Sequence, residues 1–202
     1  LVGALMGTTA LGIFSFARRI HQLLSDLVAG ALKSVSFTLL SSMQHEQEKL
    51  REAYFFATFA SSALSFPIFV GLAAVAPDFV PLVFGAHWAG AVPALQGFCV
   101  VGLLTCVGLL QSALINSQGR VSWWLYYQLA QQAGTALVVL LVFPYGIDAV
   151  VYAFAVKTMV LWPIAVTMST RLLQTGLRTY LKPFVAPAAA SLVMLVAVMV
   201  IR

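Results

Sequence analysis

Five polar side chains lie at helical spacing in the mostly apolar segment 9–43, and their chemistry is the clearest in the sequence: Arg18, Arg19, Gln22, Asp26 and Lys33. Arg19, Asp26 and Lys33 are spaced by seven positions, which places them within about 40° of one another on a helix. A stripe of three cations and one carboxylate is suited to binding an anionic group.

This stripe cannot face lipid. Each charged side chain at the centre of a bilayer costs roughly 2.5–3.5 kcal/mol, whereas a Leu or Val returns about 0.5 kcal/mol. In one interpretation Asp26 neutralises Arg19 or Lys33 and locks the helices together, or the arginines extend to the outer interface. In the other, the stripe lines a water-filled cavity and binds an anionic substrate. We favour the cavity, because one carboxylate cannot pair with three cations.

Lys157 is a second cation within an apolar segment, 149–170, which contains no acidic residue. Three alternatives remain open for it: the side chain reaches an interface, reaches Asp26 across the bundle, or faces the same cavity as the stripe. The candidate substrate-cavity residues are therefore Arg18, Arg19, Gln22, Asp26, Lys33 and Lys157.

The usual signatures of catalysis and metal binding are missing from the sequence. It contains no HExxH, GxSxG, P-loop or CxxC motif. Its three histidines, His21, His45 and His87, lie far apart and have no Cys or carboxylate companions at ligand spacing. We expect no enzymatic activity, no metal and no cofactor.

The elements that position these residues follow from composition. Apolar residues make up 61% of the chain and charged residues only 8%, whereas soluble domains carry about 25%. The basic residues are scattered between apolar stretches and form no basic patch, so a nucleic-acid partner is not expected. Because a bilayer core needs about 20 apolar residues per helix, the sequence predicts an all-α integral membrane protein of about six transmembrane helices, at 9–43, 54–76, 91–116, 121–143, 149–170 and 184–201.

The connectors between these segments alternate in charge. Three of them, 41–52, 117–122 and 171–182, contain Lys49, Arg51, Arg120, Arg171, Arg178 and Lys182. The other two, 77–90 and 144–148, contain no Lys or Arg. The excess of Lys and Arg on cytoplasmic loops of membrane proteins places the first three in the cytoplasm.

Two further features bear on the organisation of the chain. Pro67 and Pro163 lie inside predicted spans, where a proline is either a tolerated kink or a hinge for alternating access. Leu1 and Arg202 both adjoin apolar sequence, so we expect residues 1–202 to be a fragment, a single helical lobe of a larger protein.

The order of segments resembles a known family. It runs from "SDLVAGALKSVSFTLLSSMQ" through "EQEKLREAY" to "FPIFVGLAAVAPDFVPLVFGAHWAGAVPALQ". The residues that carry the likeness are Gly30, Leu32, Pro67, Ala76, Pro77, Phe84, Gly85, Trp88, Ala91, Pro93, Gln96, Gly119, Arg120 and Gly146. The chain resembles the C-terminal half of the polysaccharide transporter (Wzx-type) branch of the multidrug/oligosaccharidyl-lipid/polysaccharide exporter superfamily.

The resemblance implies two helical lobes around a cationic cavity in a multi-pass protein of the bacterial inner membrane. It also implies a cargo, an undecaprenyl-pyrophosphate-linked oligosaccharide flipped for the biosynthesis of cell-surface polysaccharide such as lipopolysaccharide. The partners are then this substrate, membrane lipids and the remaining half of the transporter. The alternatives are a multidrug-type exporter of the same fold, which favours acidic cavity residues, and a membrane enzyme acting on polyprenyl phosphates, which needs paired acidic or histidine residues in its loops.

Overall fold

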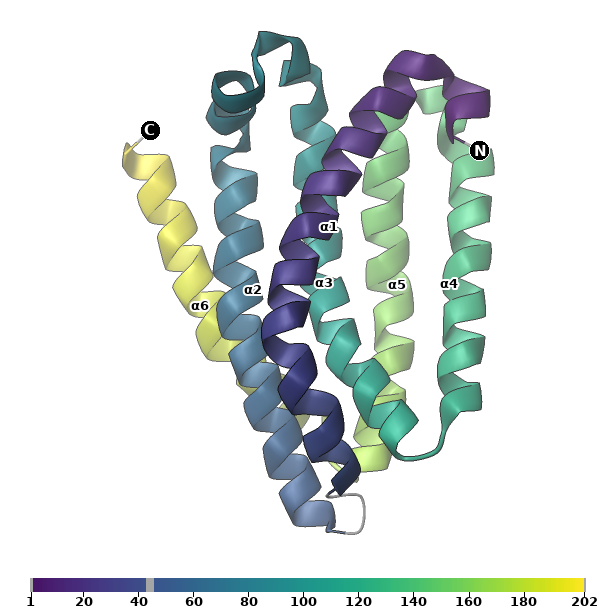
Figure 1. The fold of residues 1–202 in the computed structure, drawn as a ribbon, viewed down its shortest axis with the longest axis vertical. Coiled ribbons are helices and arrows are strands. Elements are labelled where there is room, and N and C mark those ends of the chain that lie inside the picture. Colours follow the sequence, from purple (N-terminus) through teal and green to yellow (C-terminus); the bar gives the residue numbers. More distant parts are fainter. Residues whose placement is uncertain (1, 43–45, 202) are drawn as a thin grey trace.

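The computed structural model describes residues 2–42 and 46–201, and within them the side chains of residues 7–30 and 46–200. In this part of the chain nearly every residue is helical (Figure 1). The elements are α1 (Val2–Ser42), α2 (Gln47–Phe84), η1 (Ala86–Ala91), α3 (Val92–Ser117), α4 (Val121–Val142), η2 (Phe143–Tyr145), α5 (Ile147–Leu173) and α6 (Leu177–Ile201).

Within the described residues, five segments are long and apolar enough to cross a membrane: Gln47–Phe84, Ala86–Ser117, Val121–Tyr145, Ile147–Leu173 and Leu177–Val200. A helix satisfies all of its backbone hydrogen bonds internally, which is what a segment surrounded by lipid requires. α1 runs alongside these helices for most of the length of the bundle (Figure 1). The chain is therefore a multi-pass membrane protein.

Successive helices run in opposite directions, so their connections alternate between the two ends of the bundle (Figure 1). The connections between α3 and α4 and between α5 and α6 lie at one end, together with the start of α2. η1 and η2 lie at the opposite end. The predicted connectors with and without Lys and Arg thus fall at opposite ends of the molecule; which end faces the cytoplasm stays a prediction.

The connectors are shorter than the sequence predicts. α2 begins at Gln47, so Lys49 and Arg51 lie in its first turns and not in a loop. Between α5 and α6, the predicted connector 171–182 reduces to three residues, Gln174 to Gly176. The helices extend past the predicted spans because hydropathy marks only the most apolar stretch of a helix, whereas the backbone stays paired beyond it.

α2 continues through Pro77 and Pro81 to Phe84, beyond the predicted span 54–76. A proline has no N–H group, so Pro77 leaves the carbonyl of Ala73 without its helical partner. The side-chain amide of Gln96 in α3 donates to that oxygen at 2.9 Å. A partner on the neighbouring helix therefore allows α2 to pass through this proline.

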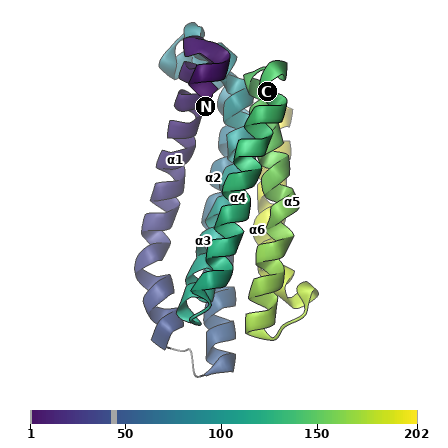
Figure 2. The ribbon, with the colours of Figure 1, turned by 90° about the vertical axis from the view of Figure 1, so that its right-hand side faces the viewer.

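α3 is the central helix. Half of its most apolar stretch is buried, against 11–28% for the four other candidate spans. Its glycines allow close approach: a Cβ atom at Gly97 would lie 2.6 Å from Cγ1 of Val151, and one at Gly102 would overlap the ring of Phe69. These contacts fix α3 between α2 and α5. α4 lies outside it and packs mainly on α5 (Figure 2).

Polar contacts join four helices, α2, α3, α5 and α6, at the end of the bundle that holds the start of α2. The hydroxyls of Tyr54 and Tyr180 lie 3.0 Å apart, and the Gln111 amide donates to Tyr180 at 2.9 Å. In addition, Gln47 and Arg51 donate to the carbonyl oxygens of Leu172 and Leu173, at 2.6 and 3.2 Å. Residues at the start of α2 thus satisfy backbone groups that the last turn of α5 leaves unpaired.

Candidate functional site

The two sides of α1 differ sharply. One side packs against the bundle and consists of residues three or four positions apart, which are Phe14, Ala17, His21, Ser25 and Val28. The other side is exposed and includes Arg18, Arg19, Gln22 and Asp26. We call these four residues the charged face of α1. The fifth member of the predicted stripe, Lys33, lies in α1, but its side chain is outside the described residues.

Within the charged face of α1, the Gln22 amide donates to a carboxylate oxygen of Asp26 at 3.1 Å. An ion pair does occur elsewhere, between Lys49 and Glu46 at 2.6 Å, where both side chains are exposed. Among the described residues, therefore, the recorded partner of Asp26 is a neutral amide one turn away and not an arginine.

The depth of the two arginines can be estimated from their neighbour Phe16. Its ring stacks on Trp88 of η1 with the centroids 4.3 Å apart, and it meets Phe84 edge-on at 4.9 Å. Arg18 and Arg19 follow within about one helical turn, so they lie near the end of the bundle that carries η1. Asp26 is eight residues beyond Arg18, which is about 12 Å further along the helix.

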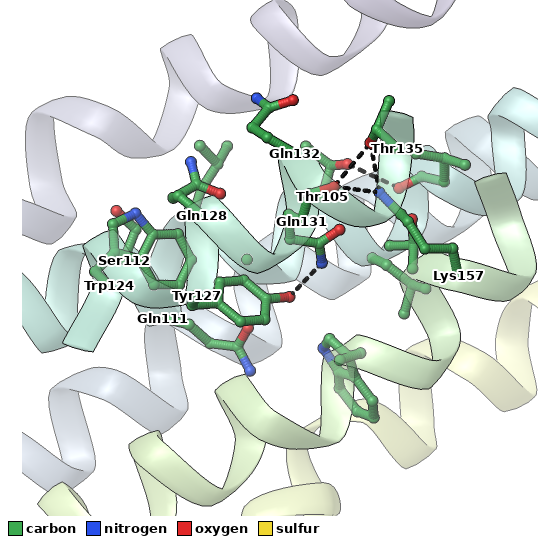
Figure 3. A pocket seen from close by; sticks show the side chains of 16 residues that line it. Thr105, Gln111, Ser112, Trp124, Tyr127, Gln128, Gln131, Gln132, Thr135 and Lys157 are labelled. Carbon is green, nitrogen blue, oxygen red and sulfur yellow. Dashed lines mark hydrogen bonds between the residues drawn. The ribbon is translucent and has the colours of Figure 1, made fainter. Parts of the chain in front are cut away.

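Lys157 is located elsewhere. It lines a half-open cavity of about 370 Å³ between α3, α4 and α5 (Figure 3). We call this the α3–α4–α5 cavity. Its polar lining consists of amides and hydroxyls: Thr105, Gln111, Ser112, Gln128, Gln131, Gln132, Thr135 and Thr158. The lining also includes three aromatic residues that carry a polar group, Trp124, Tyr127 and Trp162. The described residues that line it include none from α1.

The ammonium group of Lys157 is held by α4. It donates to Oγ1 of Thr135 at 3.0 Å and to the backbone oxygen of Gln131 at 3.4 Å. Its aliphatic chain passes close to Gly134, where a Cβ atom would lie 3.1 Å from Cδ. The Gln131 amide in turn donates to the Tyr127 hydroxyl at 2.8 Å. The structure thus brings Lys157 to α4, and its recorded partners do not include Asp26.

Two polar groups that line this cavity have no hydrogen-bond partner. Oε1 of Gln111 and Nε1 of Trp162 are both buried and unpaired. Gln111 is 0% exposed, and its amide nitrogen is already engaged with Tyr180. Because a buried polar group without a partner costs about 1–3 kcal/mol, a water molecule or polar ligand that reached these two groups would be stabilised there.

The sequence prediction singled out Lys157 but missed the glutamines around it. Gln128, Gln131 and Gln132 are spaced by three and four, so they share one side of α4. A signal was present: the segment that contains them has a mean hydropathy of 1.3, the lowest of the five candidate spans. Thr105, Gln111 and Trp162 line the cavity only because α3 and α5 pack beside α4, so their spacing in the sequence does not predict that they line it.

Comparison with known proteins agrees with the predicted resemblance. A family model described as "Polysaccharide biosynthesis protein" matches residues 1–93. The chain is 27% identical to teichuronic acid biosynthesis protein TuaB of Bacillus subtilis, over 96% of this chain and 41% of TuaB. It is 31% identical to lipopolysaccharide biosynthesis protein WzxC of Escherichia coli, over 60% of this chain and 25% of WzxC.

A third relative is succinoglycan biosynthesis transport protein ExoT of Rhizobium meliloti, which is 28% identical over 61% of this chain and 26% of ExoT. Among solved structures, the lipid II flippase MurJ in an inward closed conformation superposes with a TM-score of 0.80 at 15% identity, over 97% of this chain and 42% of MurJ. The chain therefore has the fold of part of MurJ, and it spans less than half the length of the relatives it matches. These matches confirm the resemblance to polysaccharide transporters.

Proposed function

We propose that this chain forms one lobe of a two-lobe flippase that moves an undecaprenyl-pyrophosphate-linked oligosaccharide across the bacterial inner membrane without covalent chemistry. The observation that carries the proposal is the charged face of α1. Arg18, Arg19 and Asp26 are exposed on the surface of their own bundle, although α1 lies alongside helices of membrane-spanning length (Figure 1).

Charged side chains on such a helix require a polar environment. Facing lipid, they cost roughly 2.5–3.5 kcal/mol each near the bilayer centre. In the described residues the bundle supplies one recorded partner, the Gln22 amide on Asp26. A second lobe opposite α1, with a water-filled cavity between the two, provides the missing environment. The fold supports this arrangement, because 97% of this chain corresponds to only 42% of MurJ.

The charge of this face favours an anionic cargo. The described part carries two guanidinium groups against one carboxylate, and the sequence places Lys33 in the same stripe. Arginine donates in a planar, bidentate geometry that suits phosphate oxygens. The named roles of TuaB, WzxC and ExoT in polysaccharide biosynthesis and transport support a pyrophosphate-linked glycan over the cationic substrates of a multidrug-type exporter.

The test neutralises this face in the full-length transporter. Arg19→Gln should lower glycan export in a strain that lacks the chromosomal copy, by about ten- to hundred-fold if the guanidinium makes a charged hydrogen bond to cargo. Lys49→Gln is the matched control, because it removes an exposed charge whose recorded partner is Glu46. Both variants should accumulate to wild-type levels in the membrane. Equal export by Arg19→Gln and wild type would refute the role of the face.

A further inference from the structure

The α3–α4–α5 cavity contains a positive charge without a matching negative one. Its described lining residues include no Asp or Glu, and the two recorded acceptors of the Lys157 ammonium are neutral oxygens. An ammonium group has three N–H donors, so one donor remains beyond these two. Since an uncompensated charge between membrane-spanning helices is costly, the cavity favours an anionic ligand at this end.

The remaining polar groups of the cavity call for a ligand with hydroxyls. Oε1 of Gln111 needs a donor, and Nε1 of Trp162 needs an acceptor. Both are buried, and Gln111 comes from α3 whereas Trp162 comes from α5. A hydroxyl group is at once a donor and an acceptor, so a ligand hydroxyl is the kind of partner that each of these two atoms lacks.

The aromatic residues add an apolar surface. Trp124 and Tyr127 lie on α4 with their ring centroids 5.1 Å apart, and Figure 3 shows Trp124 well separated from Lys157 along the cavity. A sugar ring presents C–H groups on its faces and hydroxyls at its edge, so it matches a site that combines aromatic rings with amides. The volume of about 370 Å³ lies within the range of small-molecule sites, about 300–1,000 Å³.

We propose that the α3–α4–α5 cavity binds a carboxylated sugar residue of the transported glycan. The carboxylate accepts from Lys157, ring hydroxyls engage Gln111 and Trp162, and a ring face lies against the aromatic pair of α4. The inference rests on the proposed function for the source of the sugar, but not for the binding itself. It assigns to this cavity a selection for acidic glycans that is separate from pyrophosphate binding on the charged face of α1.

The experiment measures binding of free monosaccharides to the purified full-length transporter by tryptophan fluorescence. The probes are glucuronic acid, glucose and acetate. Glucuronic acid should give a saturable change, glucose should bind about ten- to hundred-fold more weakly because it lacks the charged hydrogen bond, and acetate should give no saturable change. Equal affinity for glucose and glucuronic acid, or competition by acetate as strong as that of glucose, would overturn the proposal.

Variants assign the contacts. Lys157→Gln should weaken glucuronic acid by about ten- to hundred-fold and leave glucose unchanged, whereas Lys49→Gln, the exposed control, should alter neither. Trp162→Phe keeps an aromatic ring and removes only the indole N–H group, so it should weaken both sugars several-fold. This second variant tests the cavity even if Lys157→Gln fails to fold. Unchanged binding of glucuronic acid in folded Lys157→Gln, or of both sugars in Trp162→Phe, would contradict the assignment.

Failure of this inference is distinguishable from failure of the proposed function. Binding is measured without transport, so selective binding of glucuronic acid together with normal export by Arg19→Gln would refute the role of the α1 face and leave the sugar site intact. The reverse result, loss of export in Arg19→Gln with no selective sugar binding, would overturn the sugar site alone.

Discussion

The charged face of α1 and the α3–α4–α5 cavity both place cations among membrane-length helices, but they are organised differently. Lys157 has two acceptors on a neighbouring helix of the same bundle. Arg18 and Arg19 are exposed, and Asp26, the carboxylate on the same face, accepts from Gln22. The lining of the α3–α4–α5 cavity lies within this chain, so its ligand can be inferred from this chain alone. The role of the charged face of α1 depends on the part of the protein that covers it.

The largest effect is expected from substitutions that test whether Asp26 and Lys33 of α1 form an ion pair with each other or line a cavity. If the stripe lines a cavity, Lys33→Gln should reduce export by about ten- to hundred-fold with little loss of folded protein. Asp26→Asn should also leave the protein level unchanged, because the Asn side-chain oxygen still accepts from Gln22. Protein level by immunoblot and export by glycan staining measure both quantities.

A locked Asp26–Lys33 pair predicts the opposite pattern. Each single substitution would then leave a buried charge unpaired and destabilise the bundle by about 3–5 kcal/mol, and the double variant Asp26→Asn with Lys33→Gln would recover both protein level and export. Such recovery would rule out a cargo-binding role for Lys33 and remove the contrast between the two regions.

A second prediction tests whether the cavity is positioned by packing within the bundle. Gly102→Ala should destabilise the protein by about 1–3 kcal/mol, because the added methyl group overlaps the Phe69 ring and overpacks the interface of α2 and α3. Gly108→Ala in the same helix is the control, since a Cβ atom there meets nothing within 4 Å. Thermal unfolding in detergent compares them, and equal melting temperatures would show that α3 tolerates displacement.

A smaller effect is expected from the partner of Lys157. Thr135→Val removes the hydroxyl that accepts from the ammonium at 3.0 Å and should cost about 1 kcal/mol of stability. Thr167→Val is the matched control, because the exposed Thr167 hydroxyl bonds only within its own helix, to the carbonyl of Ile164. A difference between the two melting temperatures indicates that the ammonium depends on α4; identical values would show that Lys157 is held without Thr135.

The smallest effect is expected from single cysteine substitutions, which test which end of the bundle faces the cytoplasm. Single cysteines at Thr175 and Gly90 should change the free energy of unfolding by no more than about 0.5 kcal/mol, as most surface substitutions do. Export should stay at the wild-type level. In intact cells, an impermeant thiol reagent should label Gly90→Cys and not Thr175→Cys. Labelling of Thr175→Cys alone would invert the assignment and place the six Lys and Arg residues outside.

Much of the fold was predictable because it depends on quantities that a linear sequence contains. Runs of apolar residues located the helices, and the distribution of Lys and Arg assigned their ends to opposite sides. The continuation of α2 through Pro77 could not be predicted from that segment alone, because the Gln96 amide that donates to the Ala73 carbonyl comes from another helix. Gln131 and Thr135 could not be linked to Lys157 from spacing, since 22 or more positions separate them along the chain.

The hydrogen bond from Gln96 to the Ala73 carbonyl has an evolutionary consequence. The acceptor is free only because residue 77 is a proline, so the amide at 96 is useful only while that proline persists. Replacement of Pro77 by an ordinary residue would restore the helical bond of Ala73 and leave the Gln96 amide without its acceptor. In related transporters we therefore expect the two positions to vary together, with an apolar residue in place of Gln96 wherever the proline is lost.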